Sequence, residues 1–226
     1  MKYFPAFLDL RGRVCRVFGD GELAAHKASS LLDSGAQVSI VARHPGPALR
    51  ELAKRRSAEL IERPFRAGDL AGVALAIDAS EDENLHPVIA AEARAAGAWL
   101  NVVDRPSLCD YITPAVVRRG DLTIAVSTSG ASPALASRIR QDLDRVYGDE
   151  YGKALEVLRA VRSRLMAAAA PLELRQNVFK KLAASPLCRY LRDGRVDEVD
   201  RLLADVVGPE VSLASLNVHL QVSEEP

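Results

Sequence analysis

A glycine turn between an apolar segment and a helix-like segment is the feature that most constrains this chain. Gly19, Gly21 and Ala24 follow the apolar run 14–18 in Gly-x-Gly-x-x-Ala spacing. Gly19 suits a tight turn, Gly21 lets backbone approach a phosphate, and Ala24 lets the helix pack close to the strand. Taken alone, such a string also fits an ordinary tight turn, but its flanks predict a dinucleotide site. We expect cofactor contacts from Gly19, Asp20, Gly21, Glu22 and Leu23.

Strand-like and helix-like segments alternate through the first hundred residues. Apolar or β-rich runs at 38–42, 59–62, 73–78 and 99–104 are separated by helical patterns, among them 47–56 and 84–96. Apolar runs without alternation are typical of strands that are covered on both faces. We therefore predict an α/β fold, with a Rossmann-type, doubly wound parallel sheet in residues 1–113.

The pattern changes after this point. Residues 115–127 form two β-rich halves around a Gly-Asp turn, which predicts a hairpin, and Ser132-Pro133 is a typical helix start. We expect a small α+β region at 114–149. Residues 150–226 read as a helical domain with breaks near Pro171 and Ser185-Pro186, and 216–222 alternates as a strand would.

Composition limits the classes of partner. The 226 residues are 48% hydrophobic, and 30 basic residues balance 30 acidic ones, so no net charge favours nucleic acid or an anionic membrane. No apolar run has the roughly 20 residues of a membrane span. Three scattered cysteines fit a reducing compartment, and we expect a cytoplasmic protein. The four histidines share no ligand spacing, so we expect no permanent metal site.

In an open α/β sheet, ligands bind beyond the carboxyl ends of the strands. Besides the glycine turn, the residues expected there to bind a cofactor are Arg43, His44, Asp78, Ser80, Asn101 and Val103. Arg43 stands where an acid would hold the ribose of NAD, and its guanidinium also suits the 2′-phosphate of NADP, so both cofactors stay open. Asp104 ends a strand at this edge. It is either a proton-transferring group beside the nicotinamide or a loop aspartate before Arg105-Pro106.

A second group of candidates lies around residue 130. The hydroxyls and amides of this loop suit either an anion or simple helix capping. Nearby arginines suit either a polyanionic substrate or a solvated surface. The residues expected to bind substrate are Ser127, Thr128, Ser129, Gly130, Ser132, Arg118 and Arg119.

Four motifs together resemble one known family. They are Phe4–Gly12, the Gly19-Asp20-Gly21 turn with Ala24 and Lys27, Asn101–Asp104, and Ser127–Pro133. In order and spacing they resemble the precorrin-2 dehydrogenase/sirohydrochlorin ferrochelatase family, over roughly the first 150 residues. Beyond that range the resemblance is one of general helical character.

The resemblance implies a function as well as a fold. It implies a homodimer held by the central region, NAD-dependent oxidation of precorrin-2 to sirohydrochlorin, and in some members insertion of ferrous iron. The family's aspartate for both steps matches Asp104, and the carboxylates of a tetrapyrrole would give the arginines a task. No methyltransferase domain follows, so we expect a free-standing enzyme. A non-catalytic NAD(P)-binding sensor or scaffold on the same fold is the alternative.

Overall fold

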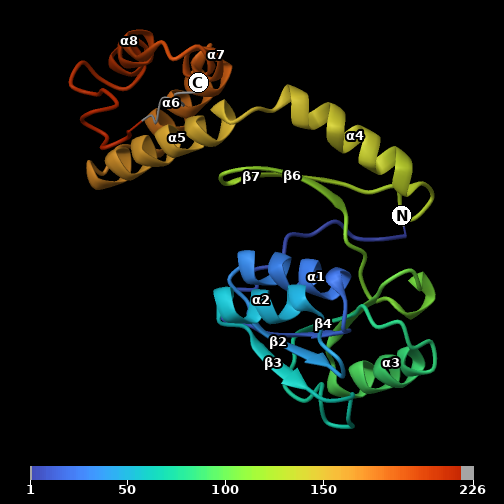
Figure 1. Ribbon diagram of the computed structural model, residues 1–226. Coiled ribbons are helices and arrows are strands. Elements are labelled where there is room, and N and C mark those ends of the chain that lie inside the picture. Colours follow the sequence, from blue (N-terminus) through green and yellow to red (C-terminus); the bar gives the residue numbers. More distant parts are fainter. Residues whose placement is uncertain (1, 220–226) are drawn as a thin grey trace. The chain divides into compact units, whose positions relative to one another are not determined.

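The computed structural model describes residues 2–219 and divides the chain into two compact units, residues 1–113 and 114–226 (Figure 1). The first contains a parallel sheet with its helices, and the second contains a hairpin followed by helices. This is the α/β architecture with a helical C-terminal region that the sequence predicts.

The sheet of the first unit has five parallel strands in the order β3-β2-β1-β4-β5. The chain reverses its direction of strand addition between β1 and β4, which is where open sheets of this kind bind ligands. One row of the register joins Phe18, Asp78 and Val102, so the loops after β1, β4 and β5 leave from one edge. The strands are β1 (Val14–Phe18), β2 (Gln37–Ala42), β3 (Glu59–Glu62), β4 (Leu75–Asp78) and β5 (Trp99–Val102).

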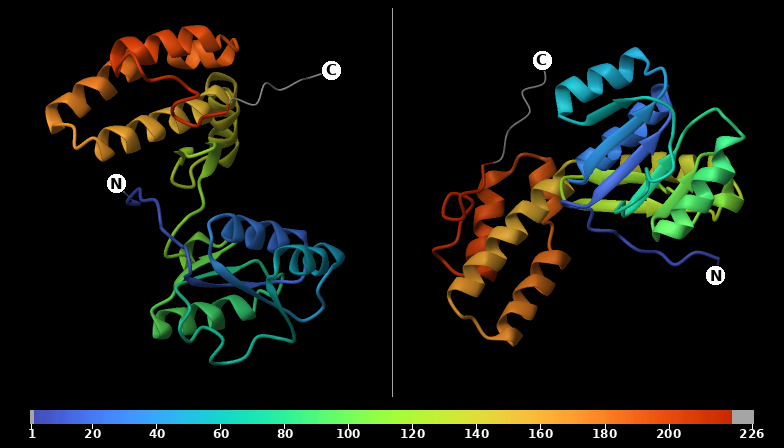
Figure 2. Two further views of the ribbon diagram at one scale, coloured as in Figure 1. Left: turned by 90° about the vertical axis from the view of Figure 1, so that its left-hand side faces the viewer. Right: turned by 90° about the horizontal axis from the view of Figure 1, so that it is seen from below.

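Both faces of this sheet are covered, as Figures 1 and 2 show. On one face, α1 (Glu22–Asp33) and α2 (Pro47–Arg56) pack on alternate side chains of the strands, such as Cys15 and Val17. On the other face, α3 (Leu85–Ala96) packs against Phe18 and the other alternate positions. Alternation along covered strands explains why the strands read as continuous apolar runs.

A loop rather than a helix connects β3 to β4. Its buried residue Asp69 accepts hydrogen bonds from Arg63 at 2.6 and 2.8 Å, and Arg16 of β1 donates to the Asp69 carbonyl oxygen. Glu92 of α3 accepts from the backbone N–H groups of Gly68 and Leu70 at 3.0 and 2.8 Å. These bonds fix the loop against the sheet and place Leu70 in the core.

The second unit begins with the antiparallel hairpin of β6 (Ala115–Arg119) and β7 (Leu122–Val126) and the helix α4 (Pro133–Val146). Gly120 has φ +54° at the hairpin tip, which meets α5 (Glu150–Ala167) at Gly152. A Cβ on Gly152 would lie 3.0 Å from the carbonyl oxygen of Arg119, so a larger residue here would push the hairpin tip and α5 apart by a few tenths of an ångström.

The remaining helices are α6 (Leu172–Ala184), α7 (Leu187–Arg192) and α8 (Val196–Val206). Together with α5 they enclose a core of Val, Leu and Ala side chains, including Val161, Leu182 and Leu203. The helix breaks fall at Pro171 and at Ser185-Pro186, as predicted. Of the strand expected at 216–222, residues 216–219 lie in a turn and an irregular stretch, and 220–222 lie outside the described residues.

Candidate functional site

The glycine turn after β1 leaves a helix start open. Gly19 has φ +136°, and a Cβ there would lie 2.6 Å from the Ala79 carbonyl oxygen, so only glycine fits. Gly21 is the N-cap of α1, makes no side-chain cap, and has nothing within 4 Å of where a Cβ would stand. The first N–H groups of α1 therefore have no capping side chain, and uncapped N–H groups at a helix start suit a phosphate. Glu22 and Leu23, which follow, are exposed.

The loop after β2 is tied to this turn. The His44 N–H donates to Asp20 Oδ1 at 3.0 Å, and the Gly46 N–H donates to the Asp20 carbonyl oxygen at 2.8 Å. Arg43 and His44 are exposed at the carboxyl end of β2. The loop that carries Arg43 and His44 therefore lies beside the glycine turn, and the contact expected between these residues and a cofactor stays a prediction.

Asp78, at the end of β4, is bound by its neighbours. Its carboxylate is fully buried and accepts from the Ser80 N–H (3.0 Å), the Ser80 hydroxyl (2.7 Å) and His86 Nδ1 (2.7 Å). Ser80 is half-buried, and the contact expected between these two residues and a cofactor stays a prediction. Their role in this geometry is to hold the loop whose Ala79 carbonyl faces Gly19.

Asn101, on β5, is also bound by a neighbour. It is buried, and its Nδ2 donates to the Tyr111 carbonyl oxygen at 3.0 Å, which fixes the chain after β5. Its expected contact with a cofactor stays a prediction. Val103 donates its N–H to the Asp78 carbonyl oxygen at 2.9 Å and packs its side chain against the core.

Asp104 lies just beyond the end of β5 and, unlike Asp78 and Asn101, is exposed to solvent. Its side chain is exposed, and its φ of +57° is the left-handed conformation that non-glycine residues adopt infrequently. Such backbone geometry clusters at functional sites. Asp104 therefore stands at the ligand-binding edge with its carboxylate available, two residues beyond the row of Phe18, Asp78 and Val102.

The loop before α4 uses most of its polar groups on itself. Ser132 caps α4 by accepting from the Leu135 N–H, and Thr128 Oγ1 accepts from the Ser132 N–H and donates to its carbonyl oxygen. Ser127 Oγ accepts from the N–H of Ser129 at 3.0 Å, where the chain is left-handed at both Ser129 and Gly130. The capping alternative thus accounts for Ser132, while the exposed Ser129 makes no hydrogen bond with its side chain among the described residues.

The two arginines of β6 differ. Arg119 is mostly buried and donates to the carbonyl oxygen and carboxylate of Asp144, and its expected contact with substrate stays a prediction. Arg118 is exposed, and no ion pair engages it within residues 2–219. Its guanidinium is free for an anionic group.

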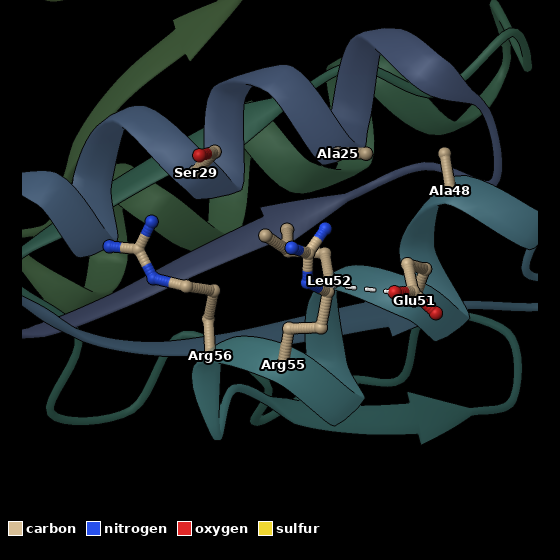
Figure 3. A pocket seen from close by; sticks show the side chains of 7 residues that line it. All are labelled: Ala25, Ser29, Ala48, Glu51, Leu52, Arg55 and Arg56. Atoms are coloured by element: carbon tan, nitrogen blue, oxygen red, sulfur yellow. Dashed lines mark ion pairs between the residues drawn. The ribbon is translucent and has the colours of Figure 1, made fainter.

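A separate groove of about 660 Å³ runs between α1 and α2 (Figure 3). None of the predicted site residues lines it. Its cations are already paired, Arg55 with Glu51 at 3.6 Å and Arg56 with Asp33 at 2.8 Å.

Residues 2–219 hold no cluster of three or more His, Cys, Asp or Glu side chains arranged to bind a metal ion. They also hold no helix that is long and apolar enough to span a membrane. The thiols of Cys15, Cys109 and Cys188 are free.

Sequence reasoning missed two participants at this edge. Ala79 matters through its carbonyl oxygen, which no side-chain pattern reveals. His86 matters through its bond to Asp78, and the signal was present in an aspartate that ends a strand and a histidine at the second position of the next helix.

Two known protein families match different parts of this chain. Residues 6–115 match a family described as putative NAD(P)-binding, and residues 119–145 match one described as sirohaem biosynthesis protein central.

Individual relatives agree with these matches. A siroheme synthase of Pseudomonas paraeruginosa is 36% identical over 97% of this chain and 48% of its own length, and that of Methylococcus capsulatus is 34% identical over 91% and 43%. The chain thus spans somewhat less than half the length of each of these two siroheme synthases. The solved structure "SirC, precorrin-2 dehydrogenase" has a TM-score of 0.72 at 22% identity, over 90% of this chain and 98% of that one, which confirms the fold.

Proposed function

Since the chain belongs to the precorrin-2 dehydrogenase/sirohydrochlorin ferrochelatase family, we propose that it oxidises precorrin-2 to sirohydrochlorin with NAD. The observation that carries the proposal is an open helix start and an exposed aspartate on one edge of a parallel sheet. Gly21 leaves the start of α1 without a capping side chain, and Asp104 follows β5 at the same edge.

The glycine turn fits a dinucleotide. A Cβ at position 21 would project into open space, and the α1 amides lack a capping side chain, so the backbone of Gly19–Leu23 would hold the pyrophosphate. The nicotinamide supplies a hydride acceptor when it is bound. Arg43 and His44 would lie at the adenosine end.

Asp104 would take the proton in this reaction. Oxidation removes two hydrogens from precorrin-2, one as a hydride to the nicotinamide and one as a proton to a base. Asp104 is exposed at the ligand-binding edge, whereas the side chains of Asp78 and Asn101 are occupied inside the protein. The Asp104 carboxylate is therefore free to act.

The second unit would contribute to substrate binding. A substrate with many carboxylates requires cationic or N–H donors. Arg118 is exposed and unpaired within residues 2–219, and the loop at Ser129 and Gly130 is exposed as well. Arg119 would support the hairpin through Asp144 instead.

We extend the proposal to a homodimer formed through residues 114–149. One face of α4 exposes Leu135 (52%), Ile139 (37%) and Val146 (57%), which helical spacing aligns. Contiguous exposed apolar residues of this kind mark interaction surfaces. Light scattering after size exclusion is expected to give twice the chain mass, and Ile139→Glu is expected to give the monomer. A monomeric wild type at micromolar concentration would contradict this.

Iron insertion is proposed as a second activity, with ferrous iron as a substrate. Insertion requires two pyrrole N–H groups to lose their protons, and the same Asp104 carboxylate would accept them one at a time, passing the first to solvent before it takes the second. The three free thiols fit a reducing compartment, so we place the reaction in the cytoplasm.

One anaerobic assay tests the whole proposal. Protein, precorrin-2 and NAD are mixed, NADH is followed at its near-ultraviolet band, and the visible spectrum is followed for sirohydrochlorin. Ferrous iron is then added and the sirohaem spectrum is monitored. NADH and sirohydrochlorin appearing together are expected. If NAD binds and neither product forms, the protein is instead a non-catalytic nucleotide-binding module.

A further inference from the structure

The strand β5 lies at the edge of the sheet, and its outer backbone groups need partners. In the order β3-β2-β1-β4-β5, no strand within residues 2–219 pairs with the outer side of β5. Trp99 and Val103 donate their N–H groups toward the β4 side. Because the direction of these groups alternates along a strand, the N–H and C=O groups of Leu100 and Val102 point outward. Both residues are buried, so their backbone groups require hydrogen-bond partners.

Two residues that follow β5 supply these partners. Asp110 Oδ2 accepts from the Leu100 N–H at 2.9 Å, and the Asp110 N–H donates to the Leu100 carbonyl oxygen at 2.8 Å. Cys109 Sγ accepts from the Val102 N–H at 3.2 Å and lies 3.2 Å from the Val102 carbonyl oxygen. The chain therefore leaves the end of β5 and returns to its outer side, and Asp104 lies within this loop.

The thiol of Cys109 contacts both ends of the turn that carries Asp104. The Arg105 N–H donates to the Val102 carbonyl oxygen at 3.2 Å, which makes residues 102–105 a turn with Asp104 as its third residue. Cys109 Sγ lies 3.3 Å from the Arg105 carbonyl oxygen and 3.2 Å from that of Val102. A third residue with positive φ favours glycine or asparagine, so an aspartate with φ +57° depends on support from its surroundings.

The environment of Cys109 suits this supporting role. The residue is half-buried and packs against the core on the α3 side of the sheet. Burial raises the pKa of its thiol, so the thiol keeps its proton at neutral pH and can both donate and accept a hydrogen bond. On the outer side of the turn, Arg105 pairs with Glu83, but side chains that are 45% and 75% exposed contribute little.

We propose that Cys109 is a positioning residue for the oxidation, because its thiol holds the turn that places the Asp104 carboxylate at the ligand-binding edge. Cys109 acts through Asp104 and needs no contact with substrate. The inference rests on the proposed function and adds a residue on which the catalytic rate depends.

Steady-state kinetics of precorrin-2 oxidation in Cys109→Ala tests the proposal. The kcat is expected to fall about ten- to a hundredfold, since a misplacement of about 1 Å can cost roughly 10²-fold. The KM for precorrin-2 and the NAD affinity measured by calorimetry are expected to change less than about twofold, because the binding groups are unaltered. Cys109→Ser keeps a donor and an acceptor and is expected to restore kcat to within about threefold of the wild type.

Two further variants separate positioning from folding. Cys109→Val cannot donate or accept, keeps most of the side-chain volume and suits the extended backbone at φ −94° and ψ 134°, so it decides the matter if Cys109→Ala does not fold. Circular dichroism checks that each variant is folded. Cys188→Ala removes another half-buried thiol, in the second unit, and is the matched control with an expected wild-type kcat.

A double variant shows whether Cys109 acts through Asp104. Asp104→Asn with Cys109→Ala is expected to have the rate of Asp104→Asn alone, whereas a role in folding alone would lower the rate equally in both backgrounds. A wild-type kcat in folded Cys109→Ala or Cys109→Val, or additive losses in the double variant, overturns this inference alone. If the wild type forms no NADH from precorrin-2 and NAD, the proposed function is overturned and this inference with it.

Discussion

Two helix starts in this molecule were expected to bind anions, and they differ in what they leave free. The start of α1 follows a glycine turn, has no side-chain cap and faces open space at Gly21. The start of α4 is capped by Ser132, and Thr128 bonds to the backbone of the capping residue. A helix start offers its N–H groups to a ligand when its own residues do not take them.

The acids of the two units also differ in whether a neighbouring side chain binds them. In the first unit, Asp104 is exposed, in a left-handed conformation, at the edge that α1 faces. In the second unit, Glu150 in the first turn of α5 is buried and bound by Arg192 Nε at 2.9 Å. Groups that hold the fold are satisfied by their neighbours, and groups that are left free are those we assign to chemistry.

Replacing the free acid should have the largest effect. Asp104→Asn keeps the size of the side chain and removes the base, so precorrin-2 oxidation is expected to fall by about 10²- to 10⁴-fold. The measurement is the initial rate of NADH formation at saturating substrate. NAD affinity is expected to stay unchanged.

Asp33→Asn is the matched control, since Asp33 lies at the far end of α1 and pairs with Arg56. Its oxidation rate is expected to equal that of the wild type. A wild-type rate in Asp104→Asn would remove this residue from the mechanism.

Making the start of α1 resemble that of α4 should weaken cofactor binding. Gly21→Ser places a side chain in the open space at the start of α1 and lets its hydroxyl cap the helix, with φ −101° suited to any residue. NAD affinity measured by calorimetry is expected to fall about tenfold or more, equivalent to roughly 1.4 kcal/mol. The free energy of unfolding should change by only a few tenths of a kcal/mol.

Gly19→Ala is the contrasting variant, because it disturbs the fold as well as the site. Its Cβ would stand 2.6 Å from the Ala79 carbonyl oxygen, so this variant is expected to lose stability as well as affinity. If Gly21→Ser bound NAD as the wild type does, the start of α1 would not be the pyrophosphate site.

Removing the side-chain cap at the start of α4 should change stability and leave cofactor binding unchanged. Ser132→Ala removes the oxygen that accepts from the Leu135 N–H, and the free energy of unfolding is expected to fall by about 1 kcal/mol in urea. NAD affinity should be unaffected. A large loss of tetrapyrrole affinity at equal stability would instead indicate that this hydroxyl contacts substrate.

The smallest effect concerns acid pH. Burial alone would raise the pKa of Glu150, but the hydrogen bond from Arg192 and backbone bonds outweigh it, so its pKa lies below the ordinary value. The stabilisation is therefore complete above the pKa of the unfolded chain and declines as pH falls through the lower folded value. Glu150→Gln should flatten the dependence of unfolding free energy on pH below about pH 4.3. An unchanged slope would contradict the contribution of this pair.

Much of the architecture followed from local pattern. The glycine turn, the apolar strands and the capped start at Ser132-Pro133 depend on residues close in sequence, and the structure places β1, β2, the hairpin and α4 where these patterns predicted them. The strand expected at 99–104 ends at Val102, because residues 103 and 104 form a turn. The strand expected to begin at Val73 is shorter, because residues 73 and 74 belong to the loop that connects β3 to β4.

The partners of polar residues could not be predicted in the same way. Asp78 and Asn101 have the polarity and position of ligand-binding residues, yet His86 and the Tyr111 carbonyl, from later elements, engage them. Arg119 is likewise taken by Asp144, which lies 25 residues away in sequence. Whether a strand-end polar group is free depends on which distant side chain folds onto it.

The central claim is that a dinucleotide lies across the carboxyl edge of the sheet with its reactive ring at Asp104. A crystal structure of the complex with NAD tests it most directly. We predict the pyrophosphate on the amides of Gly19–Leu23 and the nicotinamide carbon that accepts hydride beside the Asp104 carboxylate. A nicotinamide bound away from Asp104, or a pyrophosphate bound elsewhere in the protein, would contradict the claim.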